Sequence, residues 1–268
     1  IENSYRRDRA QDELPQSGSG RTIMTAEPKF VPEEAVELRL AEGAAFSVRL
    51  VDCVGYMVDS AVGQFEDLSP RMVMTPWFDH EIPMTEAAEI GTRKVITDHA
   101  TVGVVVTTDG TITDIPREDY REAEERVIRE LQDIGKPFVV LVNSAQPEDP
   151  RAAAAAAEIQ TRYGVTCRCV NCLTLTEEDI GDILRDLLYQ FPLRELDVFL
   201  PEWVDALPGE HPIRSGLYQE IGEAASQLTR ICALPPCLAA LSQGENIESA
   251  AASTIDLGSG VAQVEIRL

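Results

Sequence analysis

The sequence predicts an α/β fold with a mainly parallel sheet, and three features of its 268 residues carry that prediction. Between residues 84 and 191, amphipathic helical segments alternate with short apolar segments typical of buried strands. Such alternation implies right-handed crossovers and helices on both faces of the sheet. Two adjacent strand-like segments precede it, and the pattern changes after residue 192. We therefore expect a main domain over residues 1–192 and the start of an α+β module over residues 193–268.

The two segments in front of the alternation form a predicted β-hairpin. AVELRLAE (35–42) alternates apolar and polar residues, as a half-buried strand does. Gly43-Ala44 is a short turn, and AFSVRLVD (45–52) is the second strand. The next stretch, 53–82, is expected to be irregular, and irregular stretches of this length are usually functional or mobile.

In residues 84–191, amphipathic patterns predict the helices and continuous apolar runs predict the strands. In REDYREAEERVIRELQDIG (117–135), apolar residues recur at the spacing of one helix face. In TVGVVVTTDG (101–110), the unbroken apolar run suits a strand that is buried on both faces. The predicted helices are 84–99, 117–135, 150–164 and 177–191, and the predicted strands are 101–110, 136–144 and 165–171. Beyond residue 192 we expect an extended segment (193–207), one long helix (212–234) and a final strand.

The charge balance excludes several classes of partner. The chain has 23 Lys and Arg against 46 Asp and Glu, a formal net charge of −23 at pH 7. Nucleic-acid binding rests on basic residues that neutralise phosphates, so no nucleic-acid partner is expected. Attraction to an anionic membrane surface is disfavoured for the same reason. No apolar run approaches about 18 residues, so no transmembrane segment is predicted. We expect a soluble cytoplasmic protein. Because the sequence opens on polar residues without an initiator Met, we also expect that a longer chain precedes Ile1.

Three of the six cysteines form the pattern C-x-C-x-x-C at Cys167, Cys169 and Cys172. They lie in or beside a predicted buried strand. Alternation places Cys167 and Cys169 on one face of that strand and Cys172 on the other, which is a poor cage for one metal ion. We therefore expect reduced structural cysteines, since a free cysteine behaves as a small buried hydrophobe.

The end of strand 45–52 carries the strongest candidate for chemistry. A hairpin followed by parallel strands is the order of P-loop GTPase-like domains, whose nucleotide lies beyond the carboxyl ends of the strands. Asp52, Asp109 and Asn143 are predicted at such ends. In nucleotide hydrolases an Asp at this place supports Mg²⁺ through water, and the Gly of Asp-x-x-Gly lets the backbone approach the γ-phosphate. Asp52 and Gly55 fit these roles, although Asp and Gly are also the usual residues at ordinary strand ends.

The phosphate-binding loop that should accompany Asp52 is missing from the sequence. The pattern G-x-x-x-x-G-K-[ST] does not occur, and the only Gly-Lys pair, Gly135-Lys136, lies at a predicted helix end. The first strand of such a fold is expected at the centre of the sheet, between strands 45–52 and 101–108. Its absence predicts two unpaired edges and an open seam in the core. We expect no hydrolysis from these 268 residues alone.

The base-recognition segment of this fold is also altered. GTPases place Asn-Lys-x-Asp after the fifth strand, where the Asp binds guanine. The matching residues in this chain are Asn143-Ser144-Ala145-Gln146, which contain no carboxylate. A pocket that lacks this acceptor is not expected to prefer GTP strongly, and this disfavours a regulatory GTPase.

Long segments of the chain are similar to a known family. The segments TIMTAEPKFVP, RLVDCVGY, TTDGTITDI, EAEERVIREL and GKPFVVLVNS closely resemble the stage IV sporulation protein A family of endospore-forming bacteria, and the similarity runs from about residue 8 to the end. The resemblance implies a TRAFAC-type GTPase-like fold that became a Mg²⁺-dependent ATPase. Its Gly-Lys-Ser phosphate loop would lie upstream of Ile1. It also implies polymerisation, driven by ATP hydrolysis, into the basement layer of the spore coat.

The resemblance further implies where the protein acts and with which partners. The expected location is the cytoplasmic, mother-cell face of the outer forespore membrane. The expected partners are further copies of the chain, a small amphipathic membrane-anchoring peptide and other spore-coat morphogenetic proteins.

The resemblance assigns roles to single residues, with ATP and Mg²⁺ as cofactors. Asp52 matches the Mg²⁺-supporting strand-end Asp and Thr25 matches the sensor threonine, so these two are the catalytic and metal-binding candidates. Gly55 and Asn143 join them as nucleotide-binding candidates. Ala26 stands where the family often has a second threonine, which would leave sensing to Thr25 alone or weaken it. The alternative is a non-catalytic structural scaffold in which nucleotide is only a switch.

Overall fold

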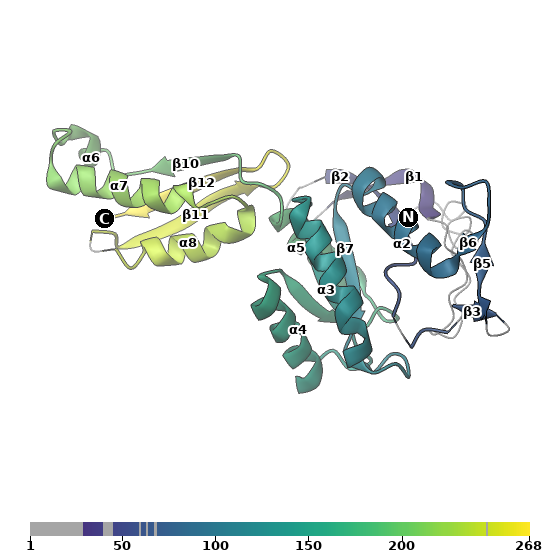
Figure 1. Ribbon diagram of the computed structural model, residues 1–268. Helices are drawn as coiled ribbons and strands as arrows, with labels where there is room; N and C mark the ends of the chain where they lie inside the picture. Colours follow the sequence, from purple (N-terminus) through teal and green to yellow (C-terminus); the bar gives the residue numbers. More distant parts are fainter. Residues whose placement is uncertain (1–28, 40–44, 59, 63, 67–68, 245) are drawn as a thin grey trace. The chain divides into compact units, whose positions relative to one another are not determined.

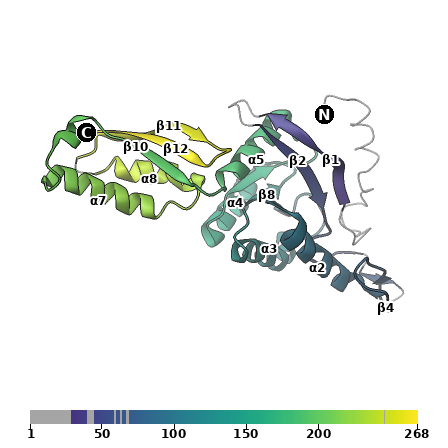
Figure 2. The ribbon, with the colours of Figure 1, turned by 90° about the horizontal axis from the view of Figure 1, so that it is seen from above.

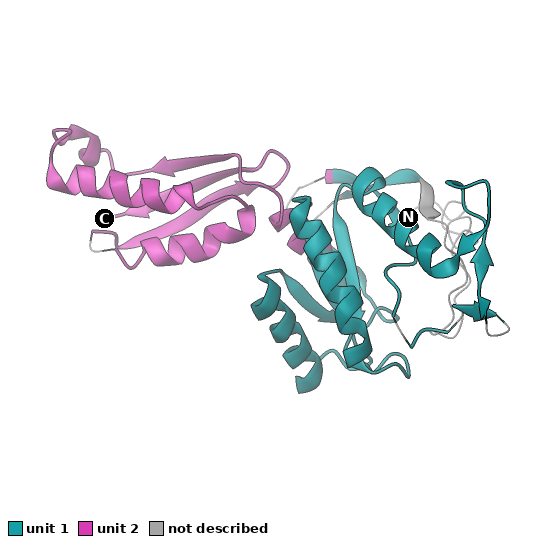
Figure 3. Cartoon of the chain, viewed as in Figure 1, with its two compact units in different colours: residues 1–39, 46–183 teal, residues 40–45, 184–268 magenta. Residues whose placement is uncertain are grey.

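The computed structural model describes residues 29–39, 45–58, 60–62, 64–66, 69–244 and 246–268. The chain divides into two compact units, which are coloured separately in Figure 3. Unit 1 comprises residues 1–39 and 46–183, and unit 2 comprises residues 40–45 and 184–268. Among the described residues, no helix is both long enough and apolar enough to cross a membrane.

In unit 1, strands and helices alternate after a pair of N-terminal strands, as the sequence predicts (Figure 1). The stretch 53–82, which the sequence predicts to be irregular, also contains short two-residue strands. Its elements in chain order are β1 (Lys29–Arg39), β2 (Ala45–Asp52), β3 (Phe65–Glu66), β4 (Ser69–Pro70), β5 (Met72–Val73), β6 (Ile82–Pro83), α2 (Met84–Lys94), the π-helical turn η1 (Val95–His99), β7 (Gly103–Thr108), α3 (Arg117–Asp133), β8 (Phe138–Asn143), α4 (Pro150–Tyr163), β9 (Cys167–Val170) and α5 (Glu177–Tyr189). The boundary between the units falls within α5. The predicted α/β class is confirmed.

The main sheet of unit 1 is parallel, as the alternation predicts. Strands β7, β8 and β9 lie in that order, and both pairs are parallel. Helix α3 lies along β7 (Figure 1). The core joins Ile128 of α3, Val140 of β8 and Ile159 of α4, each of which is at most 1% exposed. The successive side chains Phe138–Val142 are all buried, which is typical of a central parallel strand.

The strands in front of this sheet form a separate pair. β1 and β2 make a two-stranded sheet and lie side by side in Figure 2. β2 has the predicted bounds, whereas β1 begins at Lys29 rather than at residue 35 and ends at Arg39. Pro32 does not prevent this, because proline is tolerated in an edge strand. The predicted turn lies outside the described residues. Among the described strands, none pairs with both β2 and β7.

The ends of the unit 1 helices follow from local sequence. Asp149 caps α4 by accepting a hydrogen bond from the backbone N–H of Arg151 at 2.8 Å, and Pro150 occupies the first helical position. Gly164 ends α4 with a φ of 64°, and Gly135 follows α3 with a φ of 67°. These left-handed conformations suit glycine and stop both helices close to where the sequence predicts.

The predicted helix over residues 84–99 changes character before its end. It is an α-helix only to Lys94, after which the chain forms the π-helical turn η1. Lys136 donates hydrogen bonds from its ammonium group to the carbonyl oxygens of Thr97 at 2.9 Å and of Ala100 at 2.6 Å. A side chain from the α3–β8 connection therefore satisfies carbonyl groups that a helix end leaves without intrahelical partners.

Unit 2 is an α+β unit with a core of its own. Its elements are β10 (Glu195–Phe199), α6 (Trp203–Ala206), α7 (Pro212–Ser226), the short helix η2 (Ile231–Ala233), α8 (Leu234–Leu241), β11 (Ser249–Asp256) and β12 (Val261–Arg267). β12 lies between β10, to which it is parallel, and β11, to which it is antiparallel. Leu217 of α7, Leu234 of α8 and Val264 of β12 belong to one buried cluster and are at most 1% exposed.

The single long helix predicted over residues 212–234 is wrong. α7 ends at Ser226, and α8 begins only at Leu234. Between them Arg230 is extended, with a φ of −133°, and pairs with Pro192 in an isolated bridge. The tertiary bridge overrides local helix propensity at this point. The other predictions for this unit were incomplete, because α6 follows β10 and because β11 precedes the final strand β12.

Candidate functional site

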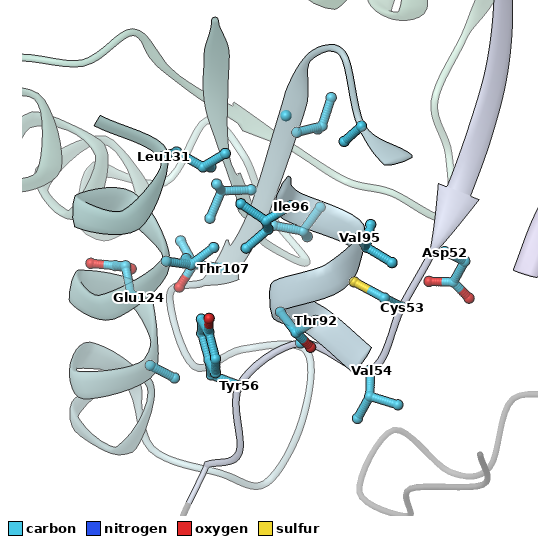
Figure 4. Close-up of a pocket in the computed structure, with 18 of the residues that line it drawn as sticks. Asp52, Cys53, Val54, Tyr56, Thr92, Val95, Ile96, Thr107, Glu124 and Leu131 are labelled. Atoms are coloured by element: carbon cyan, nitrogen blue, oxygen red, sulfur yellow. The ribbon is translucent and has the colours of Figure 1, made fainter. Parts of the chain in front are cut away.

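A cavity of about 470 Å³ separates β2 from β7 in unit 1 (Figure 4). Its lining includes Asp52, Cys53, Val54, Gly55, Tyr56, Thr92, Val95, Ile96, Thr107, Glu124 and Leu131. On the same strands, Val104 and Val106 of β7 are 44% and 57% exposed, and Leu50 of β2 is 62% exposed. Strands of a parallel sheet normally bury apolar side chains on both faces. The exposed side chains of Val104 and Val106 are therefore suited to contact a further apolar element.

The predicted Asp-x-x-Gly segment lies at the cavity. Asp52 is the last residue of β2, its side chain is exposed, and the chain runs from it past Cys53 and Val54 toward Tyr56 (Figure 4). Gly55 has a φ of 81°, and a Cβ added there would meet no atom within 4 Å. The requirement for glycine is therefore conformational rather than steric. The structure thus brings two of the predicted site residues, Asp52 and Gly55, to one place.

Cys53, between these two residues, is an unreactive thiol in this geometry. Burial is the main reason that its pKa is raised above the ordinary cysteine value, and the charge of Asp52 adds to the effect. The backbone of Gly55 acts in the opposite direction, but its effect is smaller than that of burial. A protonated thiol is a poor nucleophile and a poor metal ligand, so Cys53 acts as a spacer.

A second group of polar residues lies where β7 and β8 end. Ser144, which is fully buried, donates a hydrogen bond from its hydroxyl to Asp109 Oδ2 at 2.7 Å. Asp109 Oδ1 accepts from the backbone N–H of Thr111 at 3.0 Å and from its hydroxyl at 2.6 Å. The backbone N–H of Ala145 donates to Thr111 Oγ1 at 2.9 Å. Burial would raise the pKa of Asp109, but the hydrogen bonds from Thr111 and Ser144 outweigh it and lower the pKa.

Asn143 is positioned by contacts to the next strand-end loop. It is the last residue of β8, and its side-chain oxygen accepts a hydrogen bond from the backbone N–H of Cys172 at 3.0 Å. Asn171 in turn donates from its amide to the carbonyl oxygen of Ala145 at 3.4 Å. Asn143 does not line the cavity at Asp52. In this geometry it ties the loop after β8 to the loop after β9.

The remaining predicted site residue, Thr25, lies outside the described residues, as does Ala26. Within the described part of the chain, no group of three or more His, Cys, Asp and Glu side chains could hold a metal ion. The single exposed carboxylate of Asp52 nevertheless fits Mg²⁺. This ion usually keeps several waters and takes only one or two protein carboxylates together with phosphate oxygens. Asp52 is the described residue that would help to hold it.

The three cysteines of the C-x-C-x-x-C pattern are free. Burial raises the pKa of Cys167 to about 12, with smaller contributions from Cys169 and Glu124 that outweigh that of Arg117. Burial likewise raises the pKa values of Cys169 and Cys172. The Cys169 sulfur also donates to the carbonyl oxygen of Ala152 at 3.2 Å. Protonated thiols of this kind are structural residues.

Two contacts at the site were not foreseen from the sequence. One is the hydrogen-bond network around Asp109, and the other joins Tyr56 to Glu130 and Arg126 of α3. A parallel sheet brings successive strand ends to one edge, so the nearness of Asp109 and Ser144 could have been inferred. The contact of Tyr56 with a helix 70 or more residues away in the chain leaves no local pattern in the sequence.

Comparison with known proteins assigns both parts of the chain to domains of one family. Residues 1–192 match the description "Stage IV sporulation protein A, ATPase domain". Residues 193–268 match "Stage IV sporulation protein A, middle domain". No solved structure matches the chain.

Curated relatives carry the same description. The chain is 46% identical over 266 residues to stage IV sporulation protein A of Bacillus subtilis (strain 168), covering 99% of this chain and 54% of the relative. The protein of Bacillus anthracis gives the same identity and coverage. That of Clostridioides difficile (strain 630) is 40% identical over 267 residues, covering 100% of this chain and 54% of the relative. The chain therefore spans about half the length of these relatives.

Proposed function

The chain belongs to the stage IV sporulation protein A family, and from that premise we propose that the longer protein hydrolyses ATP with Mg²⁺ during sporulation. The observation that carries the proposal is the position of Asp52 and Gly55. An exposed carboxylate ends a strand, and three residues later a glycine with a φ of 81° lines the same cavity. Both lie in the part of the chain that matches an ATPase domain. The chemistry is phosphoryl transfer to water.

The described residues would contribute positioning and electrostatics to this reaction. The carboxylate of Asp52 accepts hydrogen bonds from metal-bound water, and the left-handed conformation of Gly55 lets its N–H face a phosphate oxygen closely. Thr25 supplies a further oxygen that senses the γ-phosphate. Bound Mg²⁺ neutralises phosphate charge. Asn143 and Ser144 shape a base-binding loop without a carboxylate, which favours ATP over GTP.

We propose that a further parallel strand of the longer protein occupies the cavity beside β7. Exposed Val104 and Val106 offer it apolar contacts. The edge of β7 that has no partner among the described strands offers it backbone hydrogen-bonding groups. In a P-loop GTPase-like fold the loop after such a strand binds the phosphates. That loop would then lie next to Asp52. The proposal accounts for the phosphate-loop motif that this sequence lacks, and it predicts no hydrolysis by these 268 residues alone.

The biological output that we propose is a polymer in the spore coat basement layer. Copies of the chain assemble with the energy of ATP hydrolysis on the mother-cell face of the outer forespore membrane. A small amphipathic membrane-anchoring peptide and other spore-coat morphogenetic proteins are the proposed further partners. The second candidate is a structural scaffold in which nucleotide is only a switch.

Phosphate release and sedimentation of the full-length protein test both candidates. Asp52→Asn keeps the size of the side chain but removes its charge, so ATP hydrolysis should fall about 10- to 100-fold. Asp133→Asn, at the end of α3, is the matched control and should change neither measurement. Loss of both hydrolysis and sedimenting polymer supports a coupled ATPase. Normal assembly by Asp52→Asn protein would contradict coupling and favour the scaffold.

A further inference from the structure

Tyr56, the residue directly after Gly55, is fastened to helix α3. It is only 9% exposed, and its ring lies 4.0 Å from the guanidinium carbon of Arg126. Its hydroxyl donates a hydrogen bond to the carboxylate of Glu130, one turn further along the same helix. A stacked cation and a hydrogen bond, both from α3, therefore hold the end of the Asp52–Tyr56 segment.

Arg126 extends this contact to helix α2. Its Nη1 and Nη2 donate to the two carboxylate oxygens of Glu89 at 3.0 Å and 3.2 Å, and its Nε donates to Glu130 at 3.4 Å. A paired fork of this kind fixes the plane of the guanidinium group. Hydrogen bonding to Glu89 raises the pKa of Arg126 above its usual range. One arginine thus joins α2, α3 and the segment after β2.

Arg129, one turn further along α3, is an ordinary surface arginine and serves as a comparison. Arg129 pairs with Glu125 at 2.7 Å, four residues away on α3. Exposed pairs of this type contribute little to stability, and both members of this one lie on α3. Arg126 is about as exposed as many surface arginines, at 42% of its side chain, but it stacks on a buried ring. Arg126 connects α3 to α2 and to Tyr56, whereas Arg129 pairs with a residue of its own helix.

We propose that Arg126 is a positioning residue for the Asp52–Tyr56 segment, holding Gly55 in place through Tyr56 and linking that segment to α2 through Glu89. The inference rests on the proposed function, because its purpose is to aim the Gly55 N–H at a phosphate. A donor that is already placed needs no ordering during reaction. Loss of Arg126 should therefore slow the chemical step more than it weakens ATP binding.

Hydrogen exchange of the full-length protein without nucleotide tests the contact itself. Arg126→Met keeps an unbranched side chain but removes the stacked charge and the fork. Amides of residues 53–58 should exchange about five-fold faster in this variant, as loss of one cation–π contact implies. Arg126→Lys should restore part of the protection, and Arg129→Met should leave it unchanged. Unchanged exchange in Arg126→Met protein would overturn the proposal.

Steady-state kinetics test the positioning role separately. In Arg126→Met protein, kcat for ATP hydrolysis should fall about ten-fold, while KM for ATP changes less than about two-fold. Arg129→Met should change neither constant. Faster exchange with an unchanged kcat would overturn the positioning role. If exchange rises as expected but the unaltered full-length protein does not hydrolyse ATP, the proposed function fails while the contact between Arg126 and the segment is supported.

Discussion

The sheets of the two units differ in how completely the described residues cover them. In unit 2 the central strand β12 has a partner on each side, and its inward side chains Ala262, Val264 and Ile266 are at most 3% exposed. In unit 1 strand β7 is at one end of its sheet, and Val104 and Val106 are largely exposed beside a cavity. The candidate site residues Asp52 and Gly55 line this cavity. In unit 2 the central strand is covered, whereas in unit 1 the candidate site lies where the packing of the described residues is incomplete.

The largest expected effect comes from placing a charge on each of the two strands. Val264→Asp buries an unpaired carboxylate in the unit 2 core and should lower the free energy of unfolding by about 4 kcal/mol. Val106→Asp in this 268-residue chain adds a charge to an exposed position and should change it by less than about 0.5 kcal/mol. Urea unfolding followed by circular dichroism measures both.

The same variant in the longer protein sharpens the comparison. If a further strand lies against β7 there, Val106→Asp becomes a core substitution and should destabilise the protein by about 2 kcal/mol or more. Equal effects of Val106→Asp and Val264→Asp in the 268-residue chain would remove the difference between the two strands. A neutral Val106→Asp in the longer protein would contradict the proposed strand.

The face of β7 opposite to Val104 and Val106 carries Thr107 and should behave like the core of unit 2. Glu124 and Arg117 form an ion pair at 2.6 Å with side chains only 4% and 11% exposed, and Arg117 also donates to Thr107 Oγ1 at 3.1 Å. Glu124→Gln leaves the buried guanidinium uncompensated and should cost about 3 kcal/mol in chemical unfolding. Glu158→Gln breaks the exposed pair with Arg121 and serves as the control, with an expected effect below about 0.5 kcal/mol. Similar losses of unfolding free energy in both variants would contradict firm packing on this face of β7.

A smaller effect is expected at the end of η1. Lys136→Met removes charged hydrogen bonds to the carbonyl oxygens of Ile96, Thr97 and Ala100 and should lower the free energy of unfolding by about 1 kcal/mol. Thermal unfolding measures the loss, and Lys94→Met, whose ammonium lies 5.8 Å from the Trp77 ring centroid, is the control. A wild-type melting temperature for Lys136→Met would show that solvent satisfies these carbonyl groups equally well.

The smallest effect is a pH dependence at the strand ends. The pKa of Asp109 is lower in the folded chain than its ordinary value, so the ionised form stabilises the fold. This stabilisation is fully present above the unfolded pKa of about 4 and is lost as pH falls through the lower folded value. Solvent screening should keep it below about 1 kcal/mol. Unfolding of Asp109→Asn protein, measured between pH 7 and about pH 2, should lack this part of the acid dependence.

The sequence predicts the longer strands and the helices of unit 1 well because they have strong periodic or apolar patterns, whereas the two-residue strands β3 to β6 have none and were not predicted. β2 has the bounds that the sequence predicts, with Asp52 as its last residue. The left-handed conformation of Gly55 agrees with the reason for expecting a glycine there. What alternation could not predict is the contact of Tyr56 with Arg126, since it depends on how a segment and a distant helix pack.

Unit 2 shows a second limit of sequence-based prediction. Residues 212–234 have the composition of a helix throughout, and the break depends on the bridge between Arg230 and Pro192. Local propensity contains no information about such a pairing. Pro235 and Pro236 could have located the start of α8, because proline is favoured in the first turn of a helix and not in its interior.

The ammonium group of Lys136 has a consequence for how unit 1 opens. It comes from the connection between α3 and β8, yet it binds carbonyl oxygens 36 to 40 residues earlier in the chain, at the end of the α2–η1 helix. That helix end is complete only while the α3–β8 connection is in place. Fraying of the α3–β8 connection therefore releases the end of the α2–η1 helix. These two stretches should lose amide protection together, as one cooperative unit of the fold.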